Sequence, residues 1–368
     1  MNLYLKGYQG SFRLLKIKCD SCEAVDASGN NDNIALVKDG KMIFAGQIYD
    51  CPEAGQLPEG AICSLNEQGI LWELFNPEEN DATIYMTGHC NSNCVMCPTT
   101  EYERRHSEGL PRDLLEQYVE LLPLNLSHVT ITGGEPTLRV DDFLFVLGTL
   151  KRKFPEVETL ILTNGRSLSV KPLMNKMLTD CPRHMTIGIP LHAAQANLHD
   201  SITQAKGSFT ETCSGIRNLL DKHVSVEIRI VVSKLNIDKL EDIAELICAK
   251  FPETSVVHFI GLETRGNCAK NAAEVYVSPQ ESFRALRPAI MKLVVAGIDV
   301  GLYNFPLCMV EKGFWNLCSR SITPEKIRYA IECDTCEAKS MCSGLFYSTL
   351  SLAKPKVSPI HFQGGRIC

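Results

Sequence analysis

The sequence has little that would indicate a membrane, secreted or nucleic-acid-binding protein. No run of 18 or more apolar residues occurs among its 368 residues, and residues 1–16 lack the three regions of a signal peptide. Lys and Arg (37) are fewer than Asp and Glu (43), so the net charge is −6 and electrostatic attraction to the phosphate backbone of a nucleic acid is not expected. No internal repeat or low-complexity tract is present. We therefore expect a cytoplasmic protein with no membrane contact and no nucleic-acid partner.

Cysteine, in contrast, is abundant, with 17 residues in a long chain that has no signal peptide. That context argues against a disulfide scaffold and favours metal or redox chemistry. Cys19 and Cys22 resemble half of a zinc knuckle that Cys51 and Cys63 could complete, but the irregular spacing favours unligated thiols. Cys368 follows a Gly-Gly stretch and is interpreted as a mobile surface thiol. Four cysteines stand singly and are interpreted as small core residues: Cys181, Cys213, Cys248 and Cys268.

Three regions are predicted from the hydrophobic pattern. Residues 1–80 read as a small β-rich domain, with a hairpin around Asp39-Gly40 and a strand at Gly69–Phe75. Residues 81–297 alternate strands and helices, and residues 298–368 begin with a strand at Ile298–Tyr303 and become rich in cysteine. The predicted strands of the middle region are Thr83–Thr87, His128–Thr132, Thr159–Thr163, Met185–Leu191, Val226–Val232 and Val256–Gly261. The predicted helices are Pro111–Leu122, Asp141–Phe154, Val170–Cys181, Phe209–Lys222, Ile237–Lys250 and Pro279–Ala296.

This alternation predicts an α/β fold with a parallel sheet covered on both faces. Six strand–helix units are too few to close an eight-stranded barrel, so a curved partial barrel, (β/α)6, is expected. Functional residues should then lie at the carboxyl ends of its strands.

The first predicted strand of this region leads directly into a loop with three cysteines. Cys90, Cys94 and Cys97 have the spacing C-x3-C-x2-C. Three thiolates on one loop can hold a cube of iron and sulfide and leave the fourth iron without a protein ligand. A small molecule with an amine and a carboxylate could chelate that iron. The alternative is a zinc site with His89 as fourth ligand, but zinc sites usually use paired C-x2-C knuckles, so the spacing favours the cluster.

The second strand ends in a glycine pair followed by an acidic residue. Gly133 and Gly134 would let a ligand approach the backbone closely, and Glu135 supplies an anion for an ammonium group. A plain turn explains this tripeptide equally well when it stands alone. It becomes specific because it follows a strand, a three-cysteine loop and a helix.

The tail contains a second set of cysteines. Cys333, Cys336 and Cys342 form C-x2-C-x5-C, and Cys308 lies upstream. Four thiolates can close an auxiliary [4Fe–4S] cluster, or alternatively a zinc site. A chain that already carries iron–sulfur chemistry favours the cluster, and Cys318 could replace Cys308 as a ligand.

The three-cysteine loop together with Gly133-Gly134-Glu135 resembles the defining motifs of the radical S-adenosylmethionine (SAM) superfamily. The resemblance implies that the open iron chelates SAM and that one electron cleaves SAM to methionine and a 5′-deoxyadenosyl radical, which abstracts a substrate hydrogen. It also implies that Gly133, Gly134 and Glu135 hold the SAM ammonium. The backbone of Met96 would meet the adenine, and Gly261 begins a stretch that resembles the adenine-side motif.

Two further SAM contacts are open to more than one interpretation. Arg229 could reach the SAM carboxylate if it points into the barrel, or it could be a surface arginine on an alternating strand. His192, at the end of the fourth strand, could face the ribose or the substrate, or it could be a hydrogen-bonded structural histidine.

A narrower resemblance covers residues 60–350. The stretches that carry it are His199-Asp200 through Phe209, Glu227–Val232, Gly261–Thr264 with Ala269-Lys270-Asn271, and Tyr303–Cys308 with the C-x2-C-x5-C tail. Together they resemble the C-type radical SAM maturase of the His-Xaa-Ser peptide systems, with a departure at Ser343-Gly344, where paired glycines are commoner. The resemblance implies a precursor peptide as substrate, a sister radical SAM maturase as heterodimer partner and an external electron donor. The alternatives are a small-molecule or nucleotide substrate, or a mainly scaffolding or electron-transfer subunit.

Overall fold

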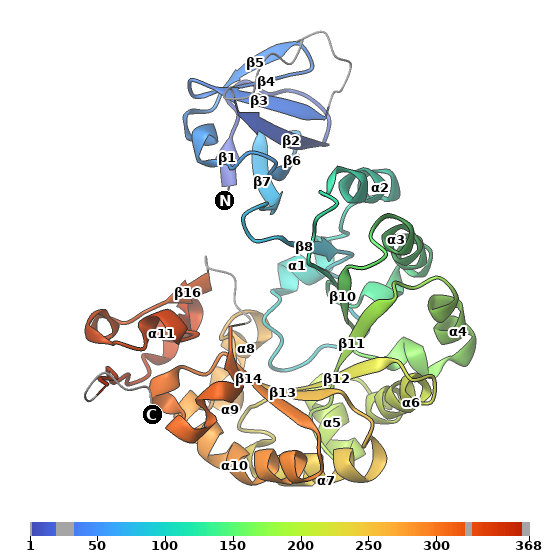
Figure 1. The fold of residues 1–368 in the computed structure, drawn as a ribbon, viewed down its shortest axis with the longest axis vertical. Helices are drawn as coiled ribbons and strands as arrows, with labels where there is room; N and C mark the ends of the chain where they lie inside the picture. Colours follow the sequence, from blue (N-terminus) through green and yellow to red (C-terminus); the bar gives the residue numbers. More distant parts are fainter. Residues whose placement is uncertain (1, 20–32, 321–325, 363–368) are drawn as a thin grey trace. The chain divides into compact units, whose positions relative to one another are not determined.

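The computed structural model describes residues 2–19, 33–320 and 326–362. The chain forms two compact units (Figure 1). The first comprises Met1–Thr87, Glu108–Ile161 and Lys176–Met185, and the second comprises Gly88–Ser107, Leu162–Asn175 and Thr186–Cys368. In the part of the chain that is described, no helix has the length and apolar character needed to cross a membrane.

The first unit begins with a β-rich sheet, as predicted. Its seven described strands are ordered β1-β7-β6-β2-β3-β4-β5. Their bounds are β1 Asn2–Tyr4, β2 Arg13–Cys19, β3 Ile34–Lys38, β4 Lys41–Phe44, β5 Gln47–Asp50, β6 Ile62–Leu65 and β7 Ile70–Phe75. The predicted hairpin joins β3 and β4, and both Asp39 (φ 49°) and Gly40 (φ 71°) adopt the positive φ that a two-residue hairpin turn requires.

Three of the four cysteines considered for a zinc knuckle belong to the core of this sheet or pack against it: Cys19, Cys51 and Cys63. Cys51 and Cys63 are fully buried in its apolar core. Burial raises the pKa of Cys63 to about 12, so its thiol keeps its proton. Cys22, like Cys368, lies outside the described residues. Of the four cysteines interpreted as core residues, Cys268 is fully buried and the other three are half-buried.

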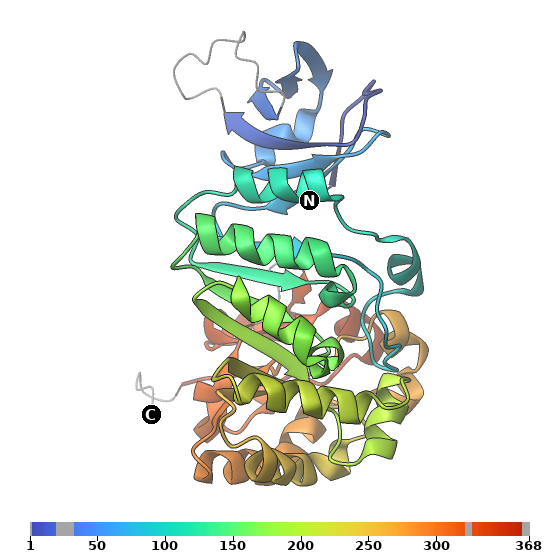
Figure 2. The same ribbon diagram turned by 90° about the vertical axis from the view of Figure 1, so that its right-hand side faces the viewer.

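The parallel sheet follows the β-rich sheet. Its first strands are β8 (Asp81–Tyr85), β9 (His128–Thr132) and β10 (Glu158–Leu162), and β9 matches its predicted bounds. Helices α2 (Arg112–Leu121) and α3 (Val140–Lys153) accompany them in the first unit and lie side by side in Figure 2. Helix α4 (Lys171–Thr179) follows β10.

The second unit continues the strand–helix alternation. Its parallel strands are β11 (His184–Pro190), β12 (Ser225–Val231), β13 (Val256–Ile260), β14 (Asp299–Tyr303) and β15 (Cys318–Ser319). In Figure 1 helices α6 (Ser208–Leu220), α7 (Leu240–Lys250) and α10 (Pro279–Val295) lie outside these strands. Shorter helices are α1 (Glu101–His106), α5 (Ala196–Thr203), α8 (Gly266–Lys270), α9 (Ala272–Val275) and α11 (Tyr347–Ala353).

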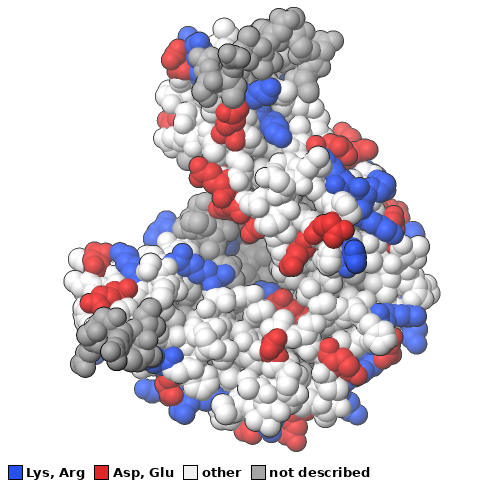
Figure 3. Space-filling view, in the orientation of Figure 1, with Lys and Arg blue, Asp and Glu red and all other residues white. Residues whose placement is uncertain are grey.

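Sheet order in the described residues follows the sequence from β8 to β15. The predicted α/β class and its six parallel strands, β8 to β13, are therefore confirmed. The strand predicted at Ile298–Tyr303 is β14, which pairs in parallel with β13 and extends the sheet, and the two-residue β15 pairs with β14. On the face shown in Figure 3, the described Lys and Arg side chains are interspersed with Asp and Glu.

Candidate functional site

The three-cysteine loop belongs to the second unit and is closed by helix α1. Thr100 caps that helix, since its hydroxyl accepts the Glu103 N–H (3.2 Å) while the Glu103 carboxylate accepts the Thr100 N–H (2.8 Å). Gly88 opens the loop, and a Cβ at this position would lie 2.2 Å from the Glu103 carbonyl oxygen. The chain can therefore enter and leave the loop at this close approach only with glycine at position 88.

Side chains from distant segments hold the backbone of the loop. The Asn267 amide donates to the Cys94 carbonyl (3.0 Å), and the Asn271 amide donates to the Val95 carbonyl (2.9 Å). The guanidinium of Arg104 donates to the Ser92 carbonyl (3.1 Å). Two backbone hydrogen bonds connect the loop to the end of α5. The Asn93 N–H donates to the Thr203 carbonyl (2.9 Å), and the Val95 N–H donates to the Ile202 carbonyl (2.9 Å). The path of the loop is thus set by the protein itself.

The three thiols are partly exposed and close enough to influence one another. Burial, followed by the neighbouring thiols of Cys97 and Cys90, raises the pKa of Cys94 to about 12. Binding iron to such a group displaces its proton, so metal binding here should release protons. Cys90 Sγ accepts the Ser92 N–H (3.4 Å) and faces the Asn164 amide nitrogen (3.9 Å).

Three thiols on one loop fit the ligand set of an iron–sulfur cube. Across residues 2–19, 33–320 and 326–362, no three His, Cys, Asp or Glu side chains are arranged to hold one metal ion. In an iron–sulfur cube, each thiolate binds a different iron, so the sulfurs need not converge on one point. A polar pocket with about 750 Å³ of empty space lies beside the loop. It is lined by His89, Cys90, Asn93, Glu101, Arg104, Arg105, Asn267 and Lys270.

The Gly-Gly-Glu motif lies in the first unit, immediately after β9. Gly133 has φ 153°, and a Cβ there would lie 2.4 Å from the Thr87 carbonyl oxygen, to which Gly134 N–H donates (2.6 Å). Both features demand glycine at position 133. Glu135 is fully buried, and one of its carboxylate oxygens accepts the N–H (3.0 Å) and hydroxyl (2.6 Å) of Thr137. This bonding fixes the orientation of the Glu135 side chain.

Met96 and His192, two other predicted site residues, are buried. Met96 is 5% exposed and His192 is 2% exposed. Burial lowers the pKa of His192 to about 3, and the neighbouring imidazole of His199 adds to this effect. The His192 N–H donates to His199 Nδ1 (3.3 Å), and the two rings stack at 5.8 Å. His192 is therefore a neutral buried imidazole, as expected if this residue is a structural histidine.

Gly261 follows β13 at the carboxyl end of the sheet. Its N–H donates to the Tyr303 carbonyl (2.9 Å), and a Cβ here would lie 2.8 Å from the Asn304 carbonyl oxygen. Gly261 lines a second cavity of about 310 Å³ of empty space, together with Leu262 and Thr349.

Arg229 belongs to a polar cluster that the sequence did not reveal. Its guanidinium donates to the carboxylate of Glu227, which is 5% exposed and also pairs with His258 Nδ1 (2.8 Å). The His258 ring stacks on Tyr303 at 4.1 Å. Burial by itself would raise the pKa of Glu227, but the hydrogen bond to His258 and the charge of Arg229 hold that pKa below its usual value.

Strand register brings this cluster together. Arg229 is level with His258, and His258 is level with Gly301, where a Cβ would lie 2.3 Å from the imidazole. Only a glycine at position 301 leaves room for the His258 ring. Arg229 is therefore half-buried in an ion-paired cluster, not a free surface arginine.

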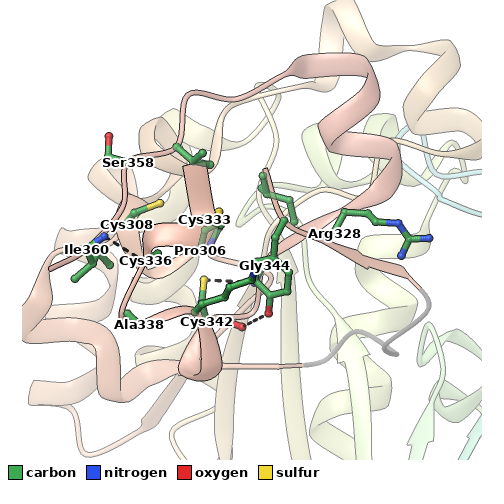
Figure 4. A pocket seen from close by; sticks show the side chains of 14 residues that line it. Pro306, Cys308, Arg328, Cys333, Cys336, Ala338, Cys342, Gly344, Ser358 and Ile360 are labelled. Carbon is green, nitrogen blue, oxygen red and sulfur yellow. Dashed lines mark hydrogen bonds between the residues drawn. The ribbon is translucent and has the colours of Figure 1, made fainter. Parts of the chain in front are cut away.

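The tail cysteines line one cavity, drawn in Figure 4. Cys308, Cys333, Cys336 and Cys342 surround about 390 Å³ of empty space. Cys342 Sγ accepts the N–H groups of residues 307 and 344 (both 3.4 Å), and Cys336 Sγ accepts that of residue 360 (3.3 Å). Burial raises the pKa of Cys308, and the charges of the other three thiols add to this. The four residues of the predicted second site are thus brought together.

Cys318, considered as a replacement for Cys308, does not line this cavity. Its thiol donates to the Phe314 carbonyl (3.8 Å), and burial raises its pKa to about 12. The geometry favours Cys308 as the fourth thiol of this set.

Comparisons with known proteins agree with these motifs. The model of the radical SAM superfamily matches residues 84–247. The antilisterial bacteriocin subtilosin biosynthesis protein AlbA of Bacillus subtilis is 28% identical over 170 residues, which are 45% of this chain and 36% of AlbA. Mycofactocin maturase MftC of Mycobacterium ulcerans is 28% identical over 165 residues, 45% of this chain and 43% of MftC.

A third relative, a probable GTP 3′,8-cyclase of Thermococcus kodakarensis, is 26% identical over 208 residues, 55% of this chain and 63% of that protein. The chain spans less than half of the length of the first two relatives. Among solved structures, SuiB of Streptococcus suis has a TM-score of 0.49 and 13% identity over 68% of this chain and 53% of SuiB. Residues 84–247, which contain both the three-cysteine loop and the Gly-Gly-Glu turn, belong to the radical SAM superfamily.

Proposed function

We propose that this chain is a radical SAM enzyme that modifies a ribosomally made precursor peptide. The observation that carries the proposal is the loop of Cys90, Cys94 and Cys97, which protein hydrogen bonds hold and which lies within the superfamily match. The peptide substrate is supported by the names of two relatives, a bacteriocin biosynthesis protein and a mycofactocin maturase. It is also supported by the resemblance to the maturases of His-Xaa-Ser systems.

The three thiols would hold a [4Fe–4S] cluster whose open iron binds SAM. Such a cluster supplies one electron that cleaves SAM and yields a 5′-deoxyadenosyl radical, which takes a hydrogen from the substrate. The residues of this chain that we assign to SAM binding are the motif 133–135 for the ammonium and the backbones of Met96 and Gly261 for the adenine. Arg229 is assigned to the carboxylate, and His192 stays a candidate for the ribose or substrate.

We assign an auxiliary [4Fe–4S] cluster to the tail cavity. Four thiolates would complete the coordination of a cube and leave no open iron, so this second cluster would transfer electrons and would not bind SAM. Cys308 is chosen over Cys318 because it lines the cavity with Cys333, Cys336 and Cys342. A four-cysteine zinc site is the competing assignment.

The same proposal includes two protein partners and an external electron donor. The precursor peptide is the substrate, and a sister radical SAM maturase is the expected heterodimer partner. We assign the docking of that partner to residues 1–80, because this segment contains no complete cofactor motif. The alternative is a structural cap that seals the first strand of the barrel, and insoluble protein after removal of residues 1–75 would favour that cap. Deleting residues 1–75 tests this: a soluble, SAM-cleaving remnant that no longer binds the partner is expected, and one that binds normally contradicts the assignment.

Iron content and SAM cleavage test the cofactor assignments. Anaerobically reconstituted protein should bind about eight irons per chain, four in each site. Changing Cys90, Cys94 and Cys97 to Ala should remove about half of this iron and abolish 5′-deoxyadenosine formation. Changing Cys333 and Cys336 to Ala should preserve at least part of the reductive SAM cleavage but prevent peptide modification. Stoichiometric zinc with little iron in anaerobically purified protein would refute the cluster assignment.

The substrate is tested separately. Anaerobic co-expression with the precursor peptide and the sister maturase should change the mass of the peptide, and the triple cysteine variant should not. The relative named as a GTP 3′,8-cyclase favours a nucleotide as the second candidate substrate. Consumption of GTP coupled to 5′-deoxyadenosine formation, with no change in the peptide, would favour that candidate.

A further inference from the structure

The turn after β10 places an amide group against the three-cysteine loop. Asn164 Oδ1 accepts the Arg166 N–H (3.0 Å), which leaves its Nδ2 facing the loop. That nitrogen donates to Asn91 Oδ1 (2.6 Å) and lies 3.9 Å from Cys90 Sγ. Because an amide has its donors at one end and its acceptor at the other, the bond to Arg166 fixes which end faces the sulfur.

The turn is anchored firmly enough to hold this orientation. Gly165 has φ 75°, and its N–H donates to the Thr163 hydroxyl (3.2 Å). The Thr212 hydroxyl of α6 donates to the Asn164 carbonyl (3.1 Å). Gly215 of the same helix packs so closely that a Cβ there would lie 2.2 Å from the Gly165 carbonyl oxygen. Asn164 is therefore positioned by packing on a helix.

A second donor approaches the same sulfur from within the loop. The Ser92 N–H lies 3.4 Å from Cys90 Sγ. Ser92 is itself held in place by Arg104, which donates to the Ser92 carbonyl. Cys90 Sγ therefore has two N–H groups within hydrogen-bond range. Hydrogen bonds to the sulfurs are among the factors that set the reduction potential of an iron–sulfur cluster.

We propose that Asn164 is a positioning residue that raises the reduction potential of the [4Fe–4S] cluster held by Cys90, Cys94 and Cys97. This inference rests on the proposed function, because it requires the cluster in this loop. Reduction takes the cluster from 2+ to 1+ by one electron from an external one-electron donor, and no bond is made or broken. The added charge is shared by the sulfurs, so an N–H donor stabilises the reduced state more than the oxidised state.

A redox titration of the reconstituted holoenzyme with dithionite, followed by the electron paramagnetic resonance signal of the reduced cluster, tests this. Cys333 and Cys336 are changed to Ala in every sample so that the first cluster alone is observed. Asn164→Ala removes the donor, and Asn164→Asp replaces it with an anion while keeping the acceptor for Arg166. Asn164→Ala should shift the reduction equilibrium about tenfold toward the oxidised form, which is about 59 mV for one electron. Asn164→Asp should shift it further in the same direction.

Asn271→Ala is the matched control. Its amide binds the Val95 carbonyl of the same loop and reports loop positioning without a donor to sulfur. The midpoint reduction potential is measured only on the molecules that hold the cluster. A variant that binds less iron therefore still gives a valid midpoint potential. Unchanged midpoints in both Asn164 variants, or an equal shift in Asn271→Ala, would overturn the inference alone. A parent protein that binds no iron and gives no cluster signal would overturn the proposed function and this inference together.

Discussion

The buried histidine pair makes the stability of the protein sensitive to mild acid. His192 and His199 have pKa values lowered by burial to about 3 and about 4, against an ordinary value of 6.5. Because the folded-state pKa values are depressed, the unfolded chain binds more protons than the folded chain below pH 6.5. The stabilisation is complete above pH 6.5 and is lost as the pH falls toward 4.

The size of the effect follows from the difference in proton binding. Between pH 7.5 and pH 5.0, each histidine that stays neutral in the folded state should lower the free energy of unfolding by about 2 kcal/mol. Carboxylates contribute little above pH 5, since their unfolded pKa values lie near 4. His192→Phe removes one of the two imidazoles, keeps an aromatic ring at this position and retains the backbone N–H that donates to His199.

Urea unfolding of the metal-free protein, followed by circular dichroism at pH 7.5 and pH 5.0, measures this effect. The free energy of unfolding that is lost between the two pH values should be about 2 kcal/mol smaller in His192→Phe than in the parent. If the free energy of unfolding falls by about 3 kcal/mol per molar urea, this corresponds to a difference of roughly 0.7 M in the shift of the urea midpoint. His106→Phe, on the exposed side of α1, is the control and should respond to pH like the parent. An identical pH response in parent and His192→Phe would show that His192 is not a neutral buried group.

Three further substitutions test other parts of the structure. Glu227→Gln leaves the guanidinium of Arg229 and the imidazole of His258 without their carboxylate and should lower the free energy of unfolding by about 3 kcal/mol. The control is Glu253→Gln, in an exposed ion pair, which should change the free energy of unfolding by less than about 1 kcal/mol. Equal effects of the two substitutions in urea unfolding would contradict the buried pairing. Gly133→Ala forces a side chain into a conformation reserved for glycine and should destabilise by about 1–3 kcal/mol, so an unchanged melting temperature would argue against the described turn. Cys308→Ala should reduce the iron bound by the tail, while Cys318→Ala should not, and the reverse result in an iron assay would exchange their roles.

The regular elements were predictable where local pattern and tertiary packing agree. The residues 128–132 alternate in burial as a strand should, and Asp39-Gly40 has the chemistry of a two-residue hairpin turn. Helices α1 and α5 were missed because they are short and carry no long apolar period. Helix α1 is instead fixed by a capping box and by its close contact with Gly88.

The site could be predicted only where the spacing of cysteines along the sequence carries the information. The three-cysteine loop and the tail set follow from sequence separations, but the choice between Cys308 and Cys318 depends on which thiol lines the cavity. The bond pattern of Asn164 and the pairing of Glu227 with His258 depend on strand register and on packing across segments far apart in the sequence. No local pattern contains that information.

The loop backbone of residues 88–97 also has a consequence for how a cluster would be assembled. Fixing the backbone of one residue takes about 1–2 kcal/mol of conformational entropy, so ordering a ten-residue loop around a metal would consume a large part of the binding free energy. Hydrogen bonds from Asn267, Asn271 and the end of α5 supply part of the order of that backbone. The bonds between iron and the three thiolates would then need to supply less of the free energy that orders the loop, and more of that free energy would retain the cluster.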